Sequence, residues 1–308
     1  MSAADSQSKS VAWRVVRITL VAAALYVGFR LLPTGTNLSH MDFRVEGGNA
    51  IEMCDPASPQ FLPVTTVRSP VSLGLVTTTP PRAGREVEIT IVLKTTAGKP
   101  ISPVDLLNVH TKLLHLMIVD PALMDYHHVH PKPLREPGHW AFSFTPEYGG
   151  EYRFFADFTP AATGLSLYAS GQLTVAGAAP APEQIDAAQT PSWQASSGGV
   201  VFDLQPAGGE IRARQETVLT LSLWRPDGGE IGLEPVMEAF AHVVAFDRDR
   251  TGFAHLHPLE TNLAVSPDRK RPTLTFRLLI PNPGRYVAWA QINDAGTERF
   301  APFWFDVK

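Results

Sequence analysis

Apolar and polar residues alternate in short segments over most of the chain. Residues 86–95 (EVEITIVLKT) follow the two-residue period of a half-buried β-strand, and the TAGKP after them is typical of a turn. Residues 113–120 (LLHLMIVD) are mostly apolar, which predicts a buried strand. Further strand patterns lie at residues 139–146, 149–158 and 170–177. Short strands at this spacing predict a β-sandwich.

The same order of strand patterns returns in the second half of the chain. It follows an Ala/Pro-rich segment at residues 176–196, which predicts a semi-extended linker. The returning patterns lie at residues 216–231, 241–247, 274–281, 284–292 and 299–307. This internal repeat predicts an all-β protein with two tandem sandwich domains. We place these domains at residues 66–175 and 197–308, after an extended lead-in over residues 34–65.

A tyrosine near the start of a late strand marks each copy. GGEY ends at Tyr152 and PGRY ends at Tyr286, a pattern that resembles the tyrosine corner of immunoglobulin-like sandwiches. The alternative is an ordinary core tyrosine. Phe155 and Trp289 follow three residues later, and we expect them to be inward core aromatics. A cupredoxin-like sandwich would give a similar list of strands, so both topologies remain open.

The N-terminus carries a separate signal. Lys9, Arg14 and Arg17 precede an apolar run over residues 18–29, which is shorter than the roughly 20 residues that span a bilayer. We predict that residues 1–33 form a signal anchor, a single transmembrane helix whose arginines extend to the interfaces. A cleaved signal peptide is the alternative. Both place the remaining chain in the periplasm or extracellular space, the anchor leaving it attached to the inner membrane.

Composition narrows the function classes. The net charge is −4 and no basic stripe is visible, so we expect no nucleic-acid partner. The single cysteine, Cys54, excludes an intramolecular disulfide, and we interpret it as a buried, inert thiol, with a soft metal ligand as the alternative. We find none of the common catalytic motifs, so we expect a protein that is not an enzyme.

Histidines recur at the same spacing in both copies. HLMIVDPALMDYHHVHP begins at His115, and HVVAFDRDRTGFAHLHP begins at His242. Without a gap the two segments share the pattern H-x12-H-x-H-P, while His127 meets Ala254 and is the odd one out. The repeated positions are His115, His128 and His130 in the first copy and His242, His255 and His257 in the second.

This spacing can bring three imidazoles together. His128 and His130 are two residues apart, so on a strand they point to the same face. A hairpin centred near Leu123 places His115 opposite His130 and diagonal to His128, so all three side chains can reach one ion. We therefore predict a metal site in each copy. The alternatives are surface histidines or a hydrogen-bonded structural network.

Other residues extend the predicted site. His110 and Met237 lie five residues before His115 and His242, and we consider them additional ligands. A histidine or methionine there suits copper better than zinc, although zinc also fits imidazole ligands, and Met237 could equally fill a core. We expect Asp120 and Asp247 to orient a histidine or to cap the turn. His40 and His139 have no counterpart, so we interpret them as surface residues.

The two histidine segments, with the later GEYRFFADF and GRYVAWAQI, resemble bacterial extracytoplasmic domains of the YtkA-like, heavy-metal-associated kind, which are immunoglobulin-like or cupredoxin-like. The resemblance covers residues 66–175 and 197–308. It implies a periplasmic copper-handling protein that binds copper or delivers it to a protein partner. His127 and the IEMCDP segment of the lead-in lie outside the pattern. The alternative function is a non-catalytic structural or protein-interaction module of two sandwiches.

Overall fold

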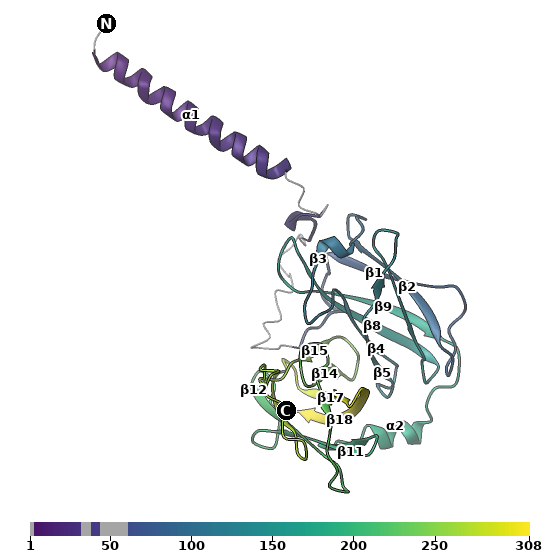
Figure 1. Ribbon diagram of the computed structural model, residues 1–308. Coiled ribbons are helices and arrows are strands. Elements are labelled where there is room, and N and C mark those ends of the chain that lie inside the picture. Colours follow the sequence, from purple (N-terminus) through teal and green to yellow (C-terminus); the bar gives the residue numbers. More distant parts are fainter. Residues whose placement is uncertain (1–2, 32–37, 44–60) are drawn as a thin grey trace. The chain divides into compact units, whose positions relative to one another are not determined.

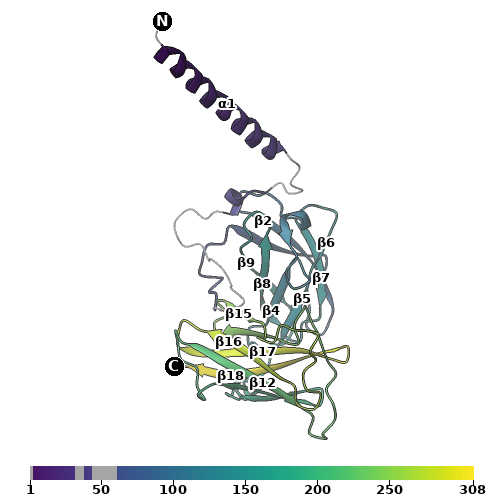
Figure 2. The same ribbon diagram turned by 60° about the vertical axis from the view of Figure 1, so that its left-hand side comes forward.

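The computed structural model describes residues 3–31, 38–43 and 61–308. It contains an N-terminal helix and a separate β-rich unit that begins at Leu38 and ends at Lys308. Figures 1 and 2 show two sandwiches in this unit, the first coloured blue to teal and the second green to yellow. The predicted all-β architecture with two tandem sandwiches is confirmed.

The first sandwich has immunoglobulin-like strand order. One sheet runs β1-β2-β7-β6, and the other runs β9-β8-β4-β5, with β3 pairing β8 as well. These orders match the A-B-E-D and G-F-C-C′ sheets of that fold. The strands are β1 (Val71–Thr77), β2 (Val87–Thr95), β3 (Leu106–Leu107), β4 (His115–Val119), β5 (Tyr126–Val129), β6 (Lys132–Pro133), β7 (His139–Phe144), β8 (Gly150–Pro160) and β9 (Leu167–Val175). A 3₁₀ turn, η2 (Pro103–Asp105), precedes β3.

The second sandwich repeats this order with one exchange of edge strands. Its sheets run β10-β11-β12-β16 and β18-β17-β14-β15, with β13 also pairing β17. The first sheet gains β10 at one edge and has no counterpart of β6 among the described residues. The strands are β10 (Gln194–Ser197), β11 (Val200–Pro206), β12 (Glu216–Trp224), β13 (Leu233–Glu234), β14 (His242–Asp247), β15 (Phe253–Leu256), β16 (Thr273–Leu279), β17 (Gly284–Asp294) and β18 (Thr297–Val307).

The hydroxyl groups of both late tyrosines form hydrogen bonds with residues upstream in the chain, as in a tyrosine corner. The Tyr286 hydroxyl donates to the Asn282 carbonyl at 3.0 Å, four residues upstream. The Tyr152 hydroxyl accepts from the Tyr148 backbone N–H at 3.1 Å and donates to the Asp125 carboxylate at 2.6 Å. Each tyrosine sits near the start of the strand equivalent to F, β8 or β17, where the immunoglobulin fold places it.

The predicted linker contains a helix and a strand. Residues 182–188 form α2 (Pro182–Ala188), which begins with proline at its first position, has Glu183 in its first turn and is rich in alanine. These features favour a helix start and helix propagation, so the expected semi-extended linker is wrong over this stretch. Strand β10 then begins the second sandwich at Gln194, inside the predicted linker.

The described parts of the lead-in join different sandwiches: Leu38 and Phe43 lie in the core of the first, whereas residues 61–65 pack on the second. The Leu62 backbone pairs with Phe253 in β15, with N···O distances of 2.8 and 3.1 Å. Phe61 lies in the second sandwich's core. Residues 61–65 therefore contact the second sandwich directly before strand β1 of the first begins. Residues 44–60, which include Cys54, lie outside the described residues.

The two domains share a third hydrophobic core besides their own. Along β4, Leu116 and Ile118 pack into the first sandwich, while Met117 and Val119 face away from it. Strand β14 alternates in the same way, so that Val244 and Phe246 face Met117 and Val119. Phe155 and Trp289 belong to this interdomain core and not to the sandwich interiors, which corrects the expectation that they face inward.

The N-terminal segment forms α1 (Ala3–Leu31), and a short 3₁₀ turn, η1 (His40–Phe43), follows later. Across residues 3–31, 38–43 and 61–308, no helix is both long enough and apolar enough to cross a membrane. The predicted transmembrane anchor is therefore not supported.

Candidate metal centre

Each histidine motif lies on one hairpin, as the spacing predicts. Strands β4 and β5 pair in a register that places Leu116 opposite Val129 and Met117 opposite His128. The same register continued by one residue brings His115 opposite His130. Strands β14 and β15 pair equivalently, with Val243 opposite Leu256. The turn of the first hairpin contains Leu123 at a positive φ of 57°.

The hairpins bring three histidines together in each copy. We call His115, His128 and His130 the first triad, and His242, His255 and His257 the second triad. In both triads, one ring nitrogen from each histidine lies within 4.8 Å of one from each of the others. Ring centroids within the triads are 4.6–5.6 Å apart. The first two histidines of each triad are buried, and the third is half-buried.

Strand alternation turns the triads away from the sandwich interiors. His115 shares its face of β4 with Met117 and Val119, which lie in the interdomain core. His128 shares its face of β5 with Tyr126, another residue of that core. Because side chains two residues apart point the same way, the triads lie at the end of the interdomain core, where the two domains meet.

Hydrogen bonds fix which nitrogen of three histidines is free to bind an ion. Nε2 of His115 donates to the Val109 carbonyl at 3.1 Å, which leaves Nδ1 with a lone pair. Nδ1 of His128 donates to Oε1 of Gln291 at 2.9 Å. Nδ1 of His255 faces Oδ2 of Asp157 at 3.4 Å, a longer contact. His128 and His255 therefore keep Nε2 free.

The remaining buried ring nitrogens have no hydrogen-bond partner among the described residues. They are Nδ1 of His115, Nε2 of His128, His130, His255 and His257, and both ring nitrogens of His242. An unpaired buried polar atom costs about 1–3 kcal/mol, so such a concentration needs an explanation. A bound metal ion would satisfy one lone pair on each histidine, because imidazole nitrogen is a common ligand.

Burial keeps these histidines uncharged. Loss of solvation lowers the pKa of His115, lowers that of His130 to about 2, and holds the pKa of His128, His242, His255 and His257 well below 6.5. Repulsion between neighbouring histidines acts in the same direction. Metal binding needs the neutral ring, so the triads are ready to coordinate near pH 7 without losing a proton first.

An ion would draw each triad together slightly. Metal–nitrogen bonds of about 2.0–2.1 Å hold two ligand atoms no more than about 4.2 Å apart. The nitrogens of each triad lie within 4.8 Å of one another, so small ring rotations suffice to close the difference. The residues present therefore fit an ion with three imidazole ligands in each copy.

The two aspartates of the motif hold the hairpin turns. The Asp120 carboxylate accepts hydrogen bonds from the backbone N–H groups of Ala122, Met124 and Asp125 at 2.7–2.9 Å. The Asp247 carboxylate accepts from the N–H and hydroxyl of Thr251 and the N–H of Gly252. Both residues thus cap the turn, the second of the two roles that the sequence left open.

His110 and Met237 occupy matching tight turns before β4 and β14. Both have positive φ, 49° and 50°, which is uncommon for residues other than glycine. The His110 ring stacks on the ring of His257 in the other copy, with centroids 4.0 Å apart, and lies 6.5 Å from His115. The structure thus places His110 against the second triad, whereas the sequence suggested a role in the first. Met237 is 9% exposed.

The remaining histidines lie apart from the triads. His127 pairs with Asp125 at 2.9 Å and packs on Phe144, on the opposite face of β5 from His128. His139 bonds the Pro137 carbonyl at 3.1 Å. His40 is exposed in η1.

Asp157 and Gln291 are the residues that sequence reasoning missed. Asp157 pairs with His115 across β4 and β8, and Gln291 pairs with His242 across β14 and β17. Both stand five residues after the late tyrosine of their copy. The aligned copies show that Asp157 and Gln291 occupy equivalent positions, but the two residue types differ. Only the fold shows that each lies beside a histidine.

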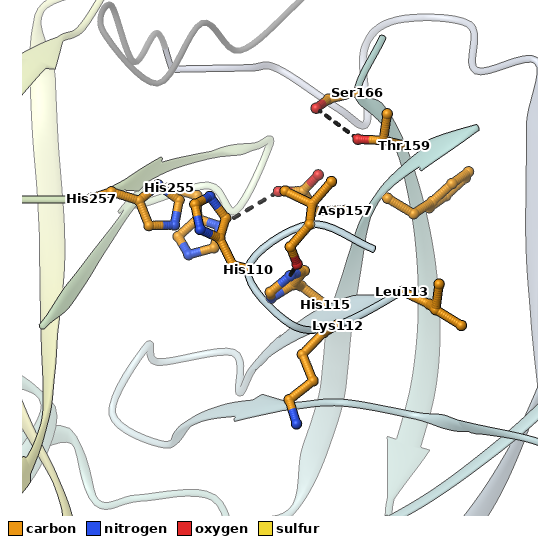
Figure 3. A pocket seen from close by; sticks show the side chains of 11 residues that line it. His110, Lys112, Leu113, His115, Asp157, Thr159, Ser166, His255 and His257 are labelled. Carbon is orange, nitrogen blue, oxygen red and sulfur yellow. Dashed lines mark hydrogen bonds and ion pairs between the residues drawn. The ribbon is translucent and has the colours of Figure 1, made fainter. Parts of the chain in front are cut away.

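A small cavity leads to the centre. Its volume is about 60 Å³, and its walls include His110, His115, Asp157, His255 and His257. Figure 3 shows Asp157 between His115 and His255, with His110 beside the rings of the second triad. One water needs roughly 10–15 Å³ of such volume, so the cavity has room for water or a small anion.

Sequence comparison places the chain in a family. The model of a domain of unknown function, DUF8832, matches residues 69–175 and 195–308, which together make up more than half of the chain. The chain belongs to this family. Its two matched segments coincide with the two sandwiches and with the sequence repeat. No curated protein sequence matches the chain.

Solved structures with similar sandwiches are distant. A mutant of Salmonella alpha-2-macroglobulin is 12% identical with a TM-score of 0.24, over 76% of this chain and 16% of that one. Fibronectin(III)-like modules of Clostridium thermocellum CbhA are 10% identical with a TM-score of 0.18, over 76% and 92%. An ICAM-5 ectodomain fragment is 12% identical with a TM-score of 0.23, over 77% and 53%. The chain thus spans about a sixth of the first of these proteins.

Proposed function

We propose that the protein binds metal ions through its two histidine triads, and that copper is the ion. The observation that carries this proposal is the meeting of three neutral, largely buried histidines in each copy, with ring nitrogens that have no partner among the described residues. Unpaired buried nitrogens are costly, and repetition of the cluster in both copies argues against accident.

Copper is favoured over zinc on chemical grounds. Among divalent first-row ions, sites of nitrogen ligands bind copper most tightly. His110 and Met237 stand at equivalent turns, and each is a residue type that copper accepts. We propose that the protein binds the ion or transfers it to a partner.

Metal analysis of the full chain tests this proposal. The protein is loaded with copper or zinc, desalted and analysed for bound metal. We expect copper to be retained, and retention to fall in His128→Ala with His130→Ala and in His255→Ala with His257→Ala. A matched control, His127→Ala with His139→Ala, removes two histidines outside the triads and should retain the ion.

The outcomes are distinct. Wild-type protein that retains no more metal than the triad variants contradicts the proposal. Equal losses in the control and the triad variants contradict it as well. In that case the histidines serve a structural or partner-binding role. Circular dichroism of each variant verifies that it is folded.

A further inference from the structure

The two triads lie against each other at the contact between the domains. The His128 ring is 5.3 Å from that of His255 and 6.0 Å from that of His242. The His115 ring is 5.8 Å from that of His255. Rings within a triad are 4.6–5.6 Å apart, so rings of different triads are nearly as close. The triads are therefore halves of one cluster.

We propose that this cluster is a single two-ion centre, in which the ions lie close enough to interact and each domain positions a ligand of the other. The inference rests on the proposed function, since it requires that the triads bind ions. It adds that the two ions interact and that each domain orients a histidine of the other domain's triad. Two-ion sites in proteins commonly hold their ions about 3.5–4 Å apart.

Reciprocal hydrogen bonds between the domains support the coupling. His128 of the first domain donates to Gln291 of the second, and His255 of the second faces Asp157 of the first. Gln291 and Asp157 occupy equivalent positions on β17 and β8. Each domain therefore orients the middle histidine of the other domain's triad and directs its free Nε2 into the cluster.

The orientation of Gln291 is itself fixed. Its Nε2 donates to Oε2 of Glu298 at 3.0 Å, and a carboxylate can only accept. The amide oxygen is therefore the atom that faces His128, which must carry its proton on Nδ1. Gln291 is a positioning residue in this arrangement, because it acts on the ion through His128 and does not contact the ion.

The positive charge of two neighbouring ions requires a negatively charged group nearby. The triads supply only neutral ligands, and two cations held close together in a buried site repel each other strongly. The Asp157 carboxylate lies in the wall of the cavity that reaches His115, His255 and His257. The same cavity, about 60 Å³, has room for a small anion such as hydroxide beside histidines of both triads. Its chemistry thus suits a centre bridged by a small oxygen ligand.

Electron paramagnetic resonance of the copper-loaded full chain tests the inference. The chain and the two triad variants are loaded with Cu(II) without a reductant, and copper content is measured on the same samples. Each variant should bind one copper and give the full signal of one isolated ion. The wild type should bind two and give a signal that is weaker than the sum of the variants or split by coupling.

The results separate the two proposals. Two coppers per chain with a signal equal to the sum of the two variants overturn the two-ion centre and leave the proposed function intact. One copper per wild-type chain also overturns it, because the cluster would then hold a single ion. No copper in any sample contradicts the proposed function itself.

A second measurement isolates the reciprocal positioning. In the variant that lacks the second triad, Gln291→Leu should lower the copper affinity of the first triad by roughly 10–100-fold. Gln291→Glu keeps an acceptor oxygen and should restore most of the affinity. Asn293→Leu, on the same face of β17, is the control and should have little effect. Unchanged affinity in Gln291→Leu, or an equal loss in Asn293→Leu, would show that the contact is only structural.

Discussion

The two sandwich domains have the same histidine triad and different residues around it. His110 corresponds to Met237, Asp157 to Gln291, and His127 to Ala254. Edge strand β6 of the first domain has no counterpart in the described second domain, which instead gains β10. The triad shared by both copies lies where the domains meet, and two of the residues that differ, Asp157 and Gln291, contact a histidine of the other domain.

This comparison indicates what the repeat is for. A single copy has one face of its β4–β5 or β14–β15 sheet without a partner, and the second copy covers that face. The same face carries the triad. Duplication thus buries the triads and brings them together, and the differing residues, Asp157 and Gln291, each act on the other copy's histidine.

Truncation of one interdomain aromatic should have the largest effect on this arrangement. Phe155 and Phe154 are adjacent on β8 and fully buried, but Phe155 faces the interdomain core and Phe154 the first sandwich. Either change to alanine should cost about 3–5 kcal/mol of the free energy of unfolding. Only Phe155→Ala should also weaken copper binding by both triads, as measured by titration. Equal weakening by Phe154→Ala would remove the distinction between the two faces.

Acid should destabilise the metal-free protein. The triad histidines have pKa values below the unfolded value of about 6.5, so below that pH the unfolded chain takes up protons that the folded chain does not. The free energy of unfolding should fall by about 1.4 kcal/mol per pH unit for each such histidine. Burial raises the pKa of Asp157 to about 6 and also raises the pKa of Asp120 and Asp247, so these three carboxyls act in the opposite direction.

Denaturant unfolding at pH 7, 6 and 5 measures this dependence. Loss of either triad should reduce the slope by roughly half, because each copy contributes three histidines. A wild-type stability that is constant between pH 7 and 5 would contradict the burial of neutral rings.

Replacing the first histidine of each triad should change the free energy of unfolding by different amounts in the two copies. His242 has neither ring nitrogen paired with a described residue, whereas His115 donates to Val109. His242→Leu should therefore raise the free energy of unfolding of the metal-free chain by about 1–3 kcal/mol, while His115→Leu should gain less. Thermal unfolding with chelator present measures both. A larger gain for His115→Leu would contradict the assigned hydrogen bonds.

Removing the hydroxyl of either late tyrosine should give the smallest difference in stability between the two copies. The Tyr152 hydroxyl bonds the Asp125 carboxylate and a backbone N–H, whereas the Tyr286 hydroxyl bonds one carbonyl. Tyr152→Phe should cost about 1.5–3 kcal/mol, because a bond to a charged group is lost, and Tyr286→Phe about 1 kcal/mol. Chemical denaturation measures both values, and the reverse order would be inconsistent with these partners.

The sequence predicts much of the local structure and little of the contact between the copies. Two-residue periodicity and the repeat predict the sandwiches, and the H-x12-H-x-H spacing predicts the hairpin register. Strand β4 is buried on both faces, so its apolar run does not tell which face meets its own sandwich and which meets the other domain. The facing of the triads and the roles of Asp157 and Gln291 follow from that choice. They therefore could not be predicted.

The N-terminal segment and the linker show two further limits. The charged and apolar pattern of residues 1–33 suggested an anchor, but the apolar run over residues 18–29 lies between Arg17 and Arg30, and no described helix is long enough and apolar enough to cross a membrane. Local alanine content and the proline at position 182 made α2 helical where composition suggested an extended chain. Composition describes a segment's average, whereas helix starts depend on single positions.

Copper-edge anomalous diffraction from crystals of the copper-loaded full chain tests the central claim most directly. We predict two anomalous peaks, each bonded to the nitrogens of one triad, side by side at the contact between the domains. Crystals of the variant that lacks the second triad should show only the peak at His115, His128 and His130. Copper bound elsewhere, with no peak at either triad, would contradict the account.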